Sequence, residues 1–258
     1  MIDTHSHIYG PEFEEDRELV VQRAQQAGVE RILLPNINEA SIEPMLALCQ
    51  SYPGYCYPMM GLHPEDVTED YLQVLDRMEE RLKDSSHPYI AVGEVGLDFY
   101  WDASYKQQQI DAFTRQIEWA VQYGLPLMIH SRSAHSELVQ ALRPYASEGL
   151  SGVFHCFGGT FEEAQELLTF DNFVLGIGGV LTFKKSPLPD ILRHIPLQRV
   201  VLETDSPYLA PVPYRGKRNE SAYVVEVMRK LADIYNVTPE EVENVTNVNV
   251  KRLFSRAK

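Results

Sequence analysis

Two histidines one residue apart, His5 and His7, are the first residues of the chain that could do chemistry. They follow the apolar pair Met1-Ile2 and lie where a first strand would end. In an extended strand, residues i and i+2 project from the same face, so both imidazoles can point at one place. Neutral imidazole is the commonest metal ligand in proteins. The pair indicates a metal site, although a bare His-x-His also fits surface histidines near a terminus.

Further histidines and carboxylates follow apolar, strand-like runs. Glu94 ends one such run, His130 and His155 end two others, and Asp205 follows a fourth. A buried carboxylate is costly unless it is paired or binds a cation, and it can bridge two ions as a histidine cannot. Each residue alone also fits a structural role, as a core histidine or half of a salt bridge. Together with the His-x-His pair they indicate a metal centre, with His5, His63, Glu94, His130, His155 and Asp205 as candidate ligands at the strand ends.

Residues next to these candidate ligands could bind or activate a substrate. Asp205 could accept a proton from a water molecule bound to the metal. Arg132 is a plausible phosphate ligand, because guanidinium groups bind such oxygens in pairs, with a structural ion pair as the alternative. His63, after the third run, either supports the ligands, faces the substrate or is structural. Glu203 either faces away or supports the ligands.

Eight runs rich in β-forming residues precede or contain these positions. Most are continuously apolar, as strands buried on both faces are. The runs are Ile2–His5, Val29–Pro35, Tyr55–Gly61, Tyr89–Glu94, Leu125–His130, Gly152–His155, Asn172–Gly178 and Arg199–Glu203.

Helical patterns lie between the strand-like runs. Apolar residues recur near a 3.6-residue period over Phe13–Ala27 and Gln107–Tyr123, and a glycine follows each segment. Thr160 and Thr238 each precede a segment with glutamate three residues later, which is the pattern of a helix N-cap. Strand and helix therefore alternate along the whole chain.

This alternation is typical of a (β/α)8 TIM barrel, with a doubly wound open sheet as the alternative. The count of eight strands favours the barrel. Candidate ligands that follow the first, fourth, fifth, sixth and eighth strands also favour it, because only a closed barrel brings those strand ends to a common mouth. We expect a single domain over residues 1–258, with the metal site at the C-terminal ends of the strands.

The composition restricts the partners. The 258 residues carry a formal net charge of −14, so broad electrostatic binding to nucleic acid is not expected, and a phosphate substrate would need local attraction. Three cysteines, an odd number without zinc-site spacing, indicate reduced thiols in the cytoplasm. No signal peptide or membrane-length apolar run is apparent. We expect a cytoplasmic monomer.

Seven short motifs, in this order along the chain, resemble those of the TatD-family deoxyribonucleases. This family of metal-dependent hydrolases belongs to the amidohydrolase-like barrels. The motifs are Asp3-Thr4-His5-Ser6-His7, Gly61-Leu62-His63-Pro64, Gly93-Glu94-Val95-Gly96-Leu97-Asp98, Ile129-His130-Ser131-Arg132, His155-Cys156-Phe157-Gly158-Gly159, Glu203-Thr204-Asp205-Ser206-Pro207 and Arg215-Gly216-Lys217-Arg218-Asn219-Glu220.

The resemblance implies two divalent ions, with Mg, Mn or Zn as candidates. His5, His7 and Asp205 would hold one ion, His130 and His155 the other, and Glu94 would bridge them. It also implies phosphodiester hydrolysis by a metal-activated water, most simply at a single-stranded DNA end. Glu94 and Asp205 would then be the catalytic carboxylates.

Two loops fit a nucleic-acid end. Arg215, Lys217 and Arg218 form a basic segment after the eighth strand, and Tyr100, within Phe99-Tyr100-Trp101, could stack on unpaired bases. A solvated loop and a hydrophobic plug are the respective alternatives. The same metal site could instead hydrolyse a small ester, lactone, amide or phosphoester, or deacylate a charged nucleic acid. A non-enzymatic scaffold is disfavoured by the complete set of ligands.

Overall fold

The computed structural model describes residues 1–101 and 103–257, so residues 102 and 258 of the expected domain lie outside the described residues. All strand pairings within its two sheets are parallel. One sheet has the order β1-β2-β3 and the other β4-β5-β6-β7-β8. The strands are β1 (Ile2–Asp3), β2 (Arg31–Leu34), β3 (Cys56–Pro58), β4 (Val92–Asp98), β5 (Leu127–Arg132), β6 (Gly152–Phe154), β7 (Phe173–Ile177) and β8 (Val200–Leu202).

Backbone hydrogen bonds join the two sheets at both edges. On one side the Thr4 N–H donates to the Leu202 carbonyl at 3.0 Å, which places the end of β1 beside β8. On the other side the Met60 N–H donates to the Ala91 carbonyl at 3.1 Å, where the chain after β3 meets the start of β4. Sequential neighbours that are linked all the way round form a TIM-barrel-like arrangement, not a doubly wound sheet.

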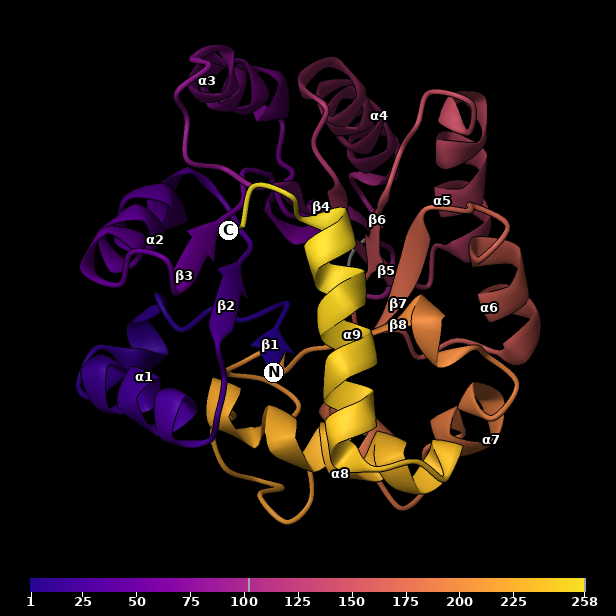
Figure 1. Cartoon of the computed structure of the whole chain (residues 1–258). Helices are drawn as coiled ribbons and strands as arrows, with labels where there is room; N and C mark the ends of the chain where they lie inside the picture. The colour runs from indigo at the N-terminus through magenta and orange to yellow at the C-terminus, as the bar shows by residue number, and fades with distance from the viewer. Residues whose placement is uncertain (102, 258) are drawn as a thin grey trace.

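Helices surround the strands, as Figure 1 shows with its view along the barrel. The side chain of Thr160 accepts from the Glu163 N–H, and that of Thr238 from the Glu241 N–H, so both predicted N-caps are confirmed. The helices are α1 (Arg17–Gln26), α2 (Glu39–Ser51), α3 (Tyr71–Lys83), α4 (Lys106–Tyr123), α5 (His135–Leu142), α6 (Phe161–Leu167), α7 (Leu188–Leu192), α8 (Val224–Tyr235) and α9 (Pro239–Leu253).

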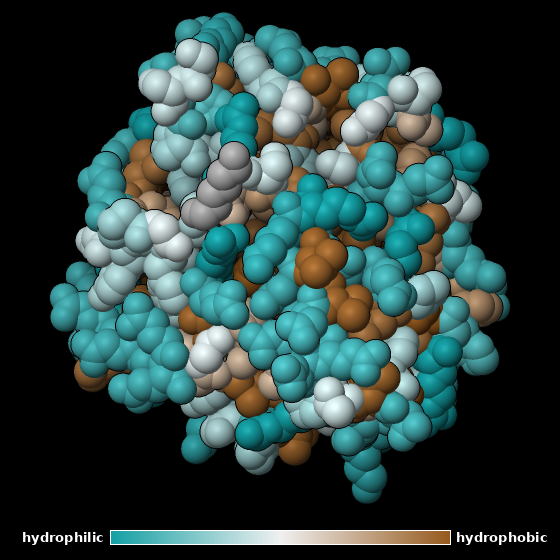
Figure 2. All heavy atoms as spheres, in the orientation of Figure 1, coloured by the Kyte–Doolittle hydropathy of each residue, from teal (hydrophilic) through white to brown (hydrophobic). Residues whose placement is uncertain are grey.

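The barrel interior is a small apolar core of its own. Side chains from all eight strand regions fill it, and Val250, Leu253 and Phe254, at the end of α9, pack against them. Helix α9 therefore crosses and closes the N-terminal end of the barrel (Figure 1). The outer side of this face is mostly hydrophilic, with apolar side chains in small groups (Figure 2). Because α9 closes the N-terminal end of the barrel, a ligand can enter only from the C-terminal ends of the strands.

Three expected boundaries are wrong in an informative way. Strand β4 runs on to Asp98 and β5 to Arg132, so Glu94 and His130 lie within strands instead of ending them. A register shift between Gly93 and Val95 marks a bulge at Glu94, and bulges re-aim side chains. The first helix begins at Arg17, after a short 3-10 turn, and not at residue 13.

None of the helices in the described part of the chain combines the length and the apolar character that a membrane span requires.

Candidate metal centre

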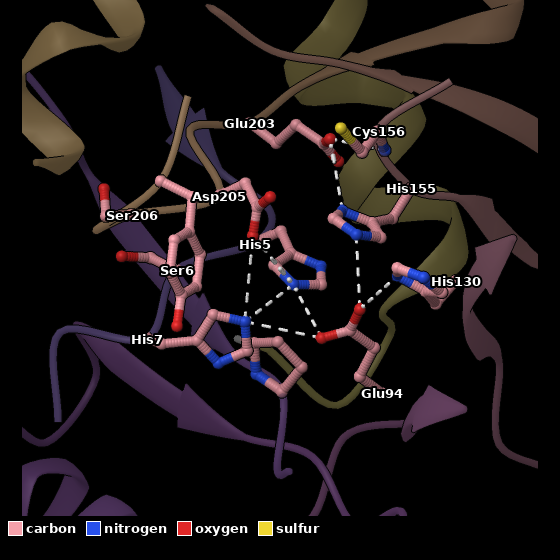
Figure 3. A network of polar contacts seen from close by, with 12 residues as sticks. His5, Ser6, His7, Glu94, His130, His155, Cys156, Glu203, Asp205 and Ser206 are labelled. Carbon is pink, nitrogen blue, oxygen red and sulfur yellow. Dashed lines mark hydrogen bonds and ion pairs between the residues drawn. The ribbon is translucent and has the colours of Figure 1, made fainter. Parts of the chain in front are cut away.

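Glu94 lies at the centre of the site, on the floor of a cavity of about 910 Å³. Its side chain is almost completely buried. The bulge at this position in β4 points its carboxylate among the histidines, as Figure 3 shows. The two carboxylate oxygens face different partners, Oε2 toward the His-x-His pair and Oε1 toward three other histidines. This is the geometry of a bridging carboxylate.

The first group of candidate ligands comes from the ends of β1 and β8. The Nε2 atoms of His5 and His7 are 3.1 Å apart, and they lie 3.1 and 3.4 Å from Glu94 Oε2. Asp205 Oδ1 is 3.7 Å from the first nitrogen and 3.8 Å from the second. The backbone N–H of Asp205 donates to the His5 carbonyl, which fixes one strand end against the other. The predicted set His5, His7 and Asp205 is therefore brought together.

The second group gathers around Oε1 of Glu94. His130 Nδ1 lies at 3.0 Å and His155 Nε2 at 3.2 Å from that oxygen. His63 Nε2 lies at 3.3 Å and forms a third side of the group. Thus all six predicted ligands share one cluster with two subgroups, and His63 lies closer to its centre than a peripheral residue would.

A hydrogen bond indicates the role of His63. Its Nδ1 accepts the backbone N–H of Glu65 at 3.2 Å, within the turn Pro64–Asp66 that follows. A neutral imidazole has one lone pair and one N–H, so the proton of His63 lies on Nε2. That nitrogen lies 3.3 Å from Glu94 Oε1 and in this tautomer offers no lone pair to a cation, although His63 lies with Glu94 and His130 in a group whose spacing would suit one. Its geometry therefore supports a bonding role beside the ligands, one of the three roles expected.

Three of the candidate ligands have a partner behind the ring. The Tyr9 hydroxyl donates to the Pro35 carbonyl and accepts from His7 Nδ1 at 2.9 Å. Asp98 Oδ2 accepts from His130 Nε2 at 3.0 Å. Glu203 Oε1 lies 3.3 Å from His155 Nδ1. Such partners fix the tautomer and ring orientation of metal-binding histidines.

Two of these partners, Tyr9 and Asp98, have no role in the expectations from sequence. For Asp98 the signal was its place four residues after Glu94, within the same apolar run. For Tyr9 the signal was the His-x-His-x-Tyr pattern with the same two-residue spacing.

The electrostatics of the cluster agree with a site for cations. Burial raises the pKa of Glu94, but the nearby His5, His63 and His155 hold it well below the usual range. Burial raises the pKa of Asp205 to about 6. Burial lowers the pKa of His5 well below its usual value, which leaves this imidazole neutral. Burial lowers the pKa of His130 and His155, but the carboxylates beside them outweigh it and raise that of His130 to about 9 and that of His155 well above its usual value. A cation at these two rings would replace their protons, because neutral imidazoles are the forms that bind metals.

The walls of the cavity differ from its floor. Among the described residues, Arg132 is the one Arg or Lys side chain that lines it, and Trp101 lines it with 69% of its surface exposed. The Arg132 guanidinium carbon lies 3.8 Å from the centre of the Tyr100 ring and 5.1 Å from that of Trp101. Tyr208 lines the cavity and is also largely exposed; it was not predicted to do so. The lining thus offers one guanidinium and two exposed aromatic faces.

The basic segment after β8, Arg215, Lys217 and Arg218, lies outside the lining of the cavity. Arg218 pairs with Asp16 Oδ2 at 2.7 Å, and the Arg215 guanidinium carbon lies 3.7 Å from the centre of the Phe183 ring. Lys217 is exposed. None of the three lines the cavity. If these three residues bind a substrate, they would contact a portion of it that lies outside the cavity, away from the bond that reacts.

The chain matches known proteins over almost its whole length. Residues 2–255 match the family model described as TatD related DNase. An "Uncharacterized metal-dependent hydrolase YabD" from Bacillus subtilis is 36% identical over 98% of both chains. A "3'-5' ssDNA/RNA exonuclease TatD" from Pectobacterium carotovorum is 34% identical over the full length of both chains.

The fold of this chain is similar to that of a solved structure. The TatD homologue YJJV from Escherichia coli has a TM-score of 0.92 and 29% sequence identity, over 99% of this chain and 98% of that one. These matches confirm the resemblance that the motifs indicated. The chain therefore belongs to the TatD-related DNase family, and it shares its TIM-barrel-like fold with this solved homologue.

Proposed function

We propose that this chain is a metal-dependent exonuclease that removes nucleotides from the end of a single-stranded nucleic acid. One observation carries the proposal: two groups of ligand atoms meet on the two oxygens of Glu94, at the floor of a cavity with one arginine on its wall. That arrangement fits a phosphodiester held over two cations. The names of the relatives support this substrate class.

The residues present fit two divalent ions. His5, His7 and Asp205 would hold one, His130 and His155 the other, with Glu94 between them. Nitrogen and oxygen donors in these numbers suit Zn, Mn or related ions, and Mg less well. When bound, the ions would supply a Lewis acid for the phosphoryl oxygen and lower the pKa of the attacking water.

The chain's own residues complete the chemistry. Asp205, at the edge of the cavity, would accept the proton of the attacking water and orient it. His63, with its proton on Nε2, would donate a hydrogen bond to Glu94 or to a phosphate oxygen. Arg132 would bind a phosphate oxygen beyond the reacting one, held in place by the Tyr100 ring beneath it.

The form of the nucleic acid follows from the cavity and the charge. A recessed cavity inside a barrel mouth can take a flexible strand end more easily than a duplex. The protein's net charge of −14 gives no general attraction for a polyanion, so binding must be local. Base stacking on Trp101, and a contact of Lys217 with a more distant phosphate, would supply it.

Nucleotide release from end-labelled single-stranded DNA tests the proposal directly. The protein would be stripped of metal and then supplied with Mg, Mn or Zn. We expect stepwise release that requires a metal and is absent in Glu94→Ala. Labels at either end, on DNA and on RNA, would show which end is entered and which nucleic acid is preferred.

The alternative is hydrolysis of a small phosphoester or another small ester, lactone or amide. An uncharged ester, lactone or amide is favoured by the acidic balance of the lining, where Glu65, Asp66 and Glu163 outnumber Arg132. No nucleotide release with any metal, from a protein shown to bind two ions, would overturn the nuclease proposal. Turnover in a panel of small substrates would then identify the bond that is hydrolysed.

The exposed ring of Trp101 gives a separate prediction about the substrate. Removing it in Trp101→Ala should raise KM for single-stranded DNA about 5- to 150-fold, because stacking of one base contributes about 1–3 kcal/mol. The matched variant Trp101→Phe keeps an aromatic face and should lose much less. Steady-state kinetics with oligonucleotides measures both. Equal KM values for wild type and both variants would exclude a stacking role.

A further inference from the structure

Glu203 is a buried carboxylate behind the metal centre, where its Oε1 lies 3.3 Å from His155 Nδ1. Its side chain is fully buried, two residues before Asp205. Figure 3 shows it on the far side of the His155 ring from Glu94. Oε1 accepts the Cys156 backbone N–H at 2.6 Å, which anchors the carboxylate. Burying a charged carboxylate is costly unless nearby groups compensate its charge, so we expect such partners in its surroundings.

Three buried polar atoms without a hydrogen-bond partner among the described residues belong to this region. They are Oε2 of Glu203, Nδ1 of His155 and Nδ1 of His5. The two rings stack with centres 3.6 Å apart at an angle of 15°. Ligand atoms of all three residues lie within 4.8 Å of one another. Buried polar atoms are satisfied in nearly all proteins, so a small movement of the carboxylate or one bridging water would most simply join these three to one another.

A third cation at this point is not compatible with the rest of the site. A neutral imidazole has a single lone pair. For His5 and His155, Nε2 faces Glu94 and the proposed ions. Each Nδ1 must then carry the proton, and a proton donor cannot bind a metal. A carboxylate, which only accepts hydrogen bonds, is the partner that suits two such donors.

We propose that Glu203 is a positioning residue that fixes His5 and His155 in the same tautomer and so couples the two metal positions. The inference rests on the proposed metal centre. His5 belongs to one group of ligands and His155 to the other. Glu203 Oε1 lies 3.3 Å from His155 Nδ1, and ligand atoms of Glu203 and His5 lie within 4.8 Å, so one carboxylate would support one ligand of each group. The other supports are separate, since Asp98 holds only His130 and Tyr9 holds only His7.

The backbone near Glu203 is shaped to hold this carboxylate in place. A Cβ on Gly176, in β7, would overlap Oε2 of Glu203. A Cβ on Gly178 would lie 3.6 Å from Glu203 Cγ, in ordinary contact. Gly176 therefore leaves the space that the carboxylate occupies beneath the two histidines. The substitution Gly176→Ala should displace the carboxylate without changing its charge, although the new Cβ would also lie 3.1 Å from His155 Cα.

The substitution Glu203→Gln tests the coupling, because glutamine keeps the size and can still accept the Cys156 N–H. Its carbonyl oxygen would take the place of Oε1, near the Cys156 N–H and His155 Nδ1, and its NH2 the place of Oε2. Both Nδ1–H groups would then lose a charged acceptor, so the tautomer with the proton on Nε2, which cannot bind a metal there, should become more populated. Affinity for both ions should fall about 10- to 100-fold, as for other partners behind metal ligands. Calorimetric titration and metal analysis measure it.

The matched variant is Asp98→Asn, which disturbs the support of His130 alone. It should weaken one ion and leave the other, whereas Glu203→Gln and Gly176→Ala should weaken both. Two-dimensional 15N–1H NMR of the histidine rings reports tautomers directly: the wild type should show protons on Nδ1 of His5 and His155, and Glu203→Gln should show a larger share of both rings with the proton on Nε2. This readout would not respond to a general loss of packing.

The outcomes separate this inference from the proposed function. A wild-type protein that binds no divalent ion would contradict the metal centre itself. A wild type with two ions, together with a folded Glu203→Gln protein that keeps both affinities and both tautomers, would overturn the coupling role alone. Weakening of a single ion in Glu203→Gln would also overturn it, because the carboxylate would then support one group only.

Discussion

Replacing Glu94 by glutamine is expected to reduce bound metal from two ions to at most one and to lower kcat about a thousandfold or more. The carboxylate faces His5 and His7 with one oxygen and His130 and His155 with the other. Glutamine has one carbonyl oxygen, so its NH2 must face one of the two groups. A lost cation removes several kcal/mol of transition-state stabilisation, at about 1.4 kcal/mol per tenfold in rate. Metal analysis and single-turnover kinetics measure the two effects.

The matched control for this variant is Glu163→Gln, on the rim of the same cavity. Glu163 belongs to the capping box of α6, and glutamine serves equally well at that position. The control should therefore keep its fold, both ions and its activity. Two ions retained in Glu94→Gln, with kcat within tenfold of wild type, would contradict the bridging role.

Much of the fold was predictable because a buried parallel strand has a simple pattern. Continuous apolar runs such as Val200–Leu202, closed by polar residues, mark both the strand and the end at which a site can lie. Sequence-local signals, such as the N-caps at Thr160 and Thr238, were equally readable. The barrel followed from the number of such units and from the spread of candidate ligands among them.

The parts that could not be predicted depend on contacts between distant segments. The bulge at Glu94 arises from pairing between β4 and β5, and nothing local marks it. The structural pairing of Arg218 with Asp16 joins residues 202 positions apart, so the sequence alone presents Arg218 as free for substrate. The support of His130 by Asp98 likewise needs the register of two strands. Residue types identify candidate ligands, and register decides what surrounds them.

The substitution Asp205→Asn separates proton transfer from metal binding and is expected to lower kcat about 100- to 10,000-fold, the usual range for a lost general base. Asparagine keeps the shape and a carbonyl oxygen for the ion, but it cannot accept a proton. It also tolerates the left-handed backbone at this position, where φ is 59°. The fold should therefore survive. An amide oxygen is a weaker ligand than a carboxylate, so kcat and KM are compared at a metal concentration that keeps both ions bound. KM should then change little, which calorimetry and steady-state kinetics can verify.

The role of Asp205 as a base also predicts how kcat depends on pH. A carboxylate base works only when deprotonated, so wild-type kcat should rise as pH increases through the pKa of Asp205. Burial raises that pKa to about 6 without a metal, and a bound cation favours the charged form and lowers it. The rising limb should thus lie below pH 6 and be missing in Asp205→Asn. A variant that binds both ions and keeps wild-type kcat with an unchanged limb would show that another group accepts the proton. His63 would not be that group, because its Nδ1 is already bonded to the Glu65 N–H.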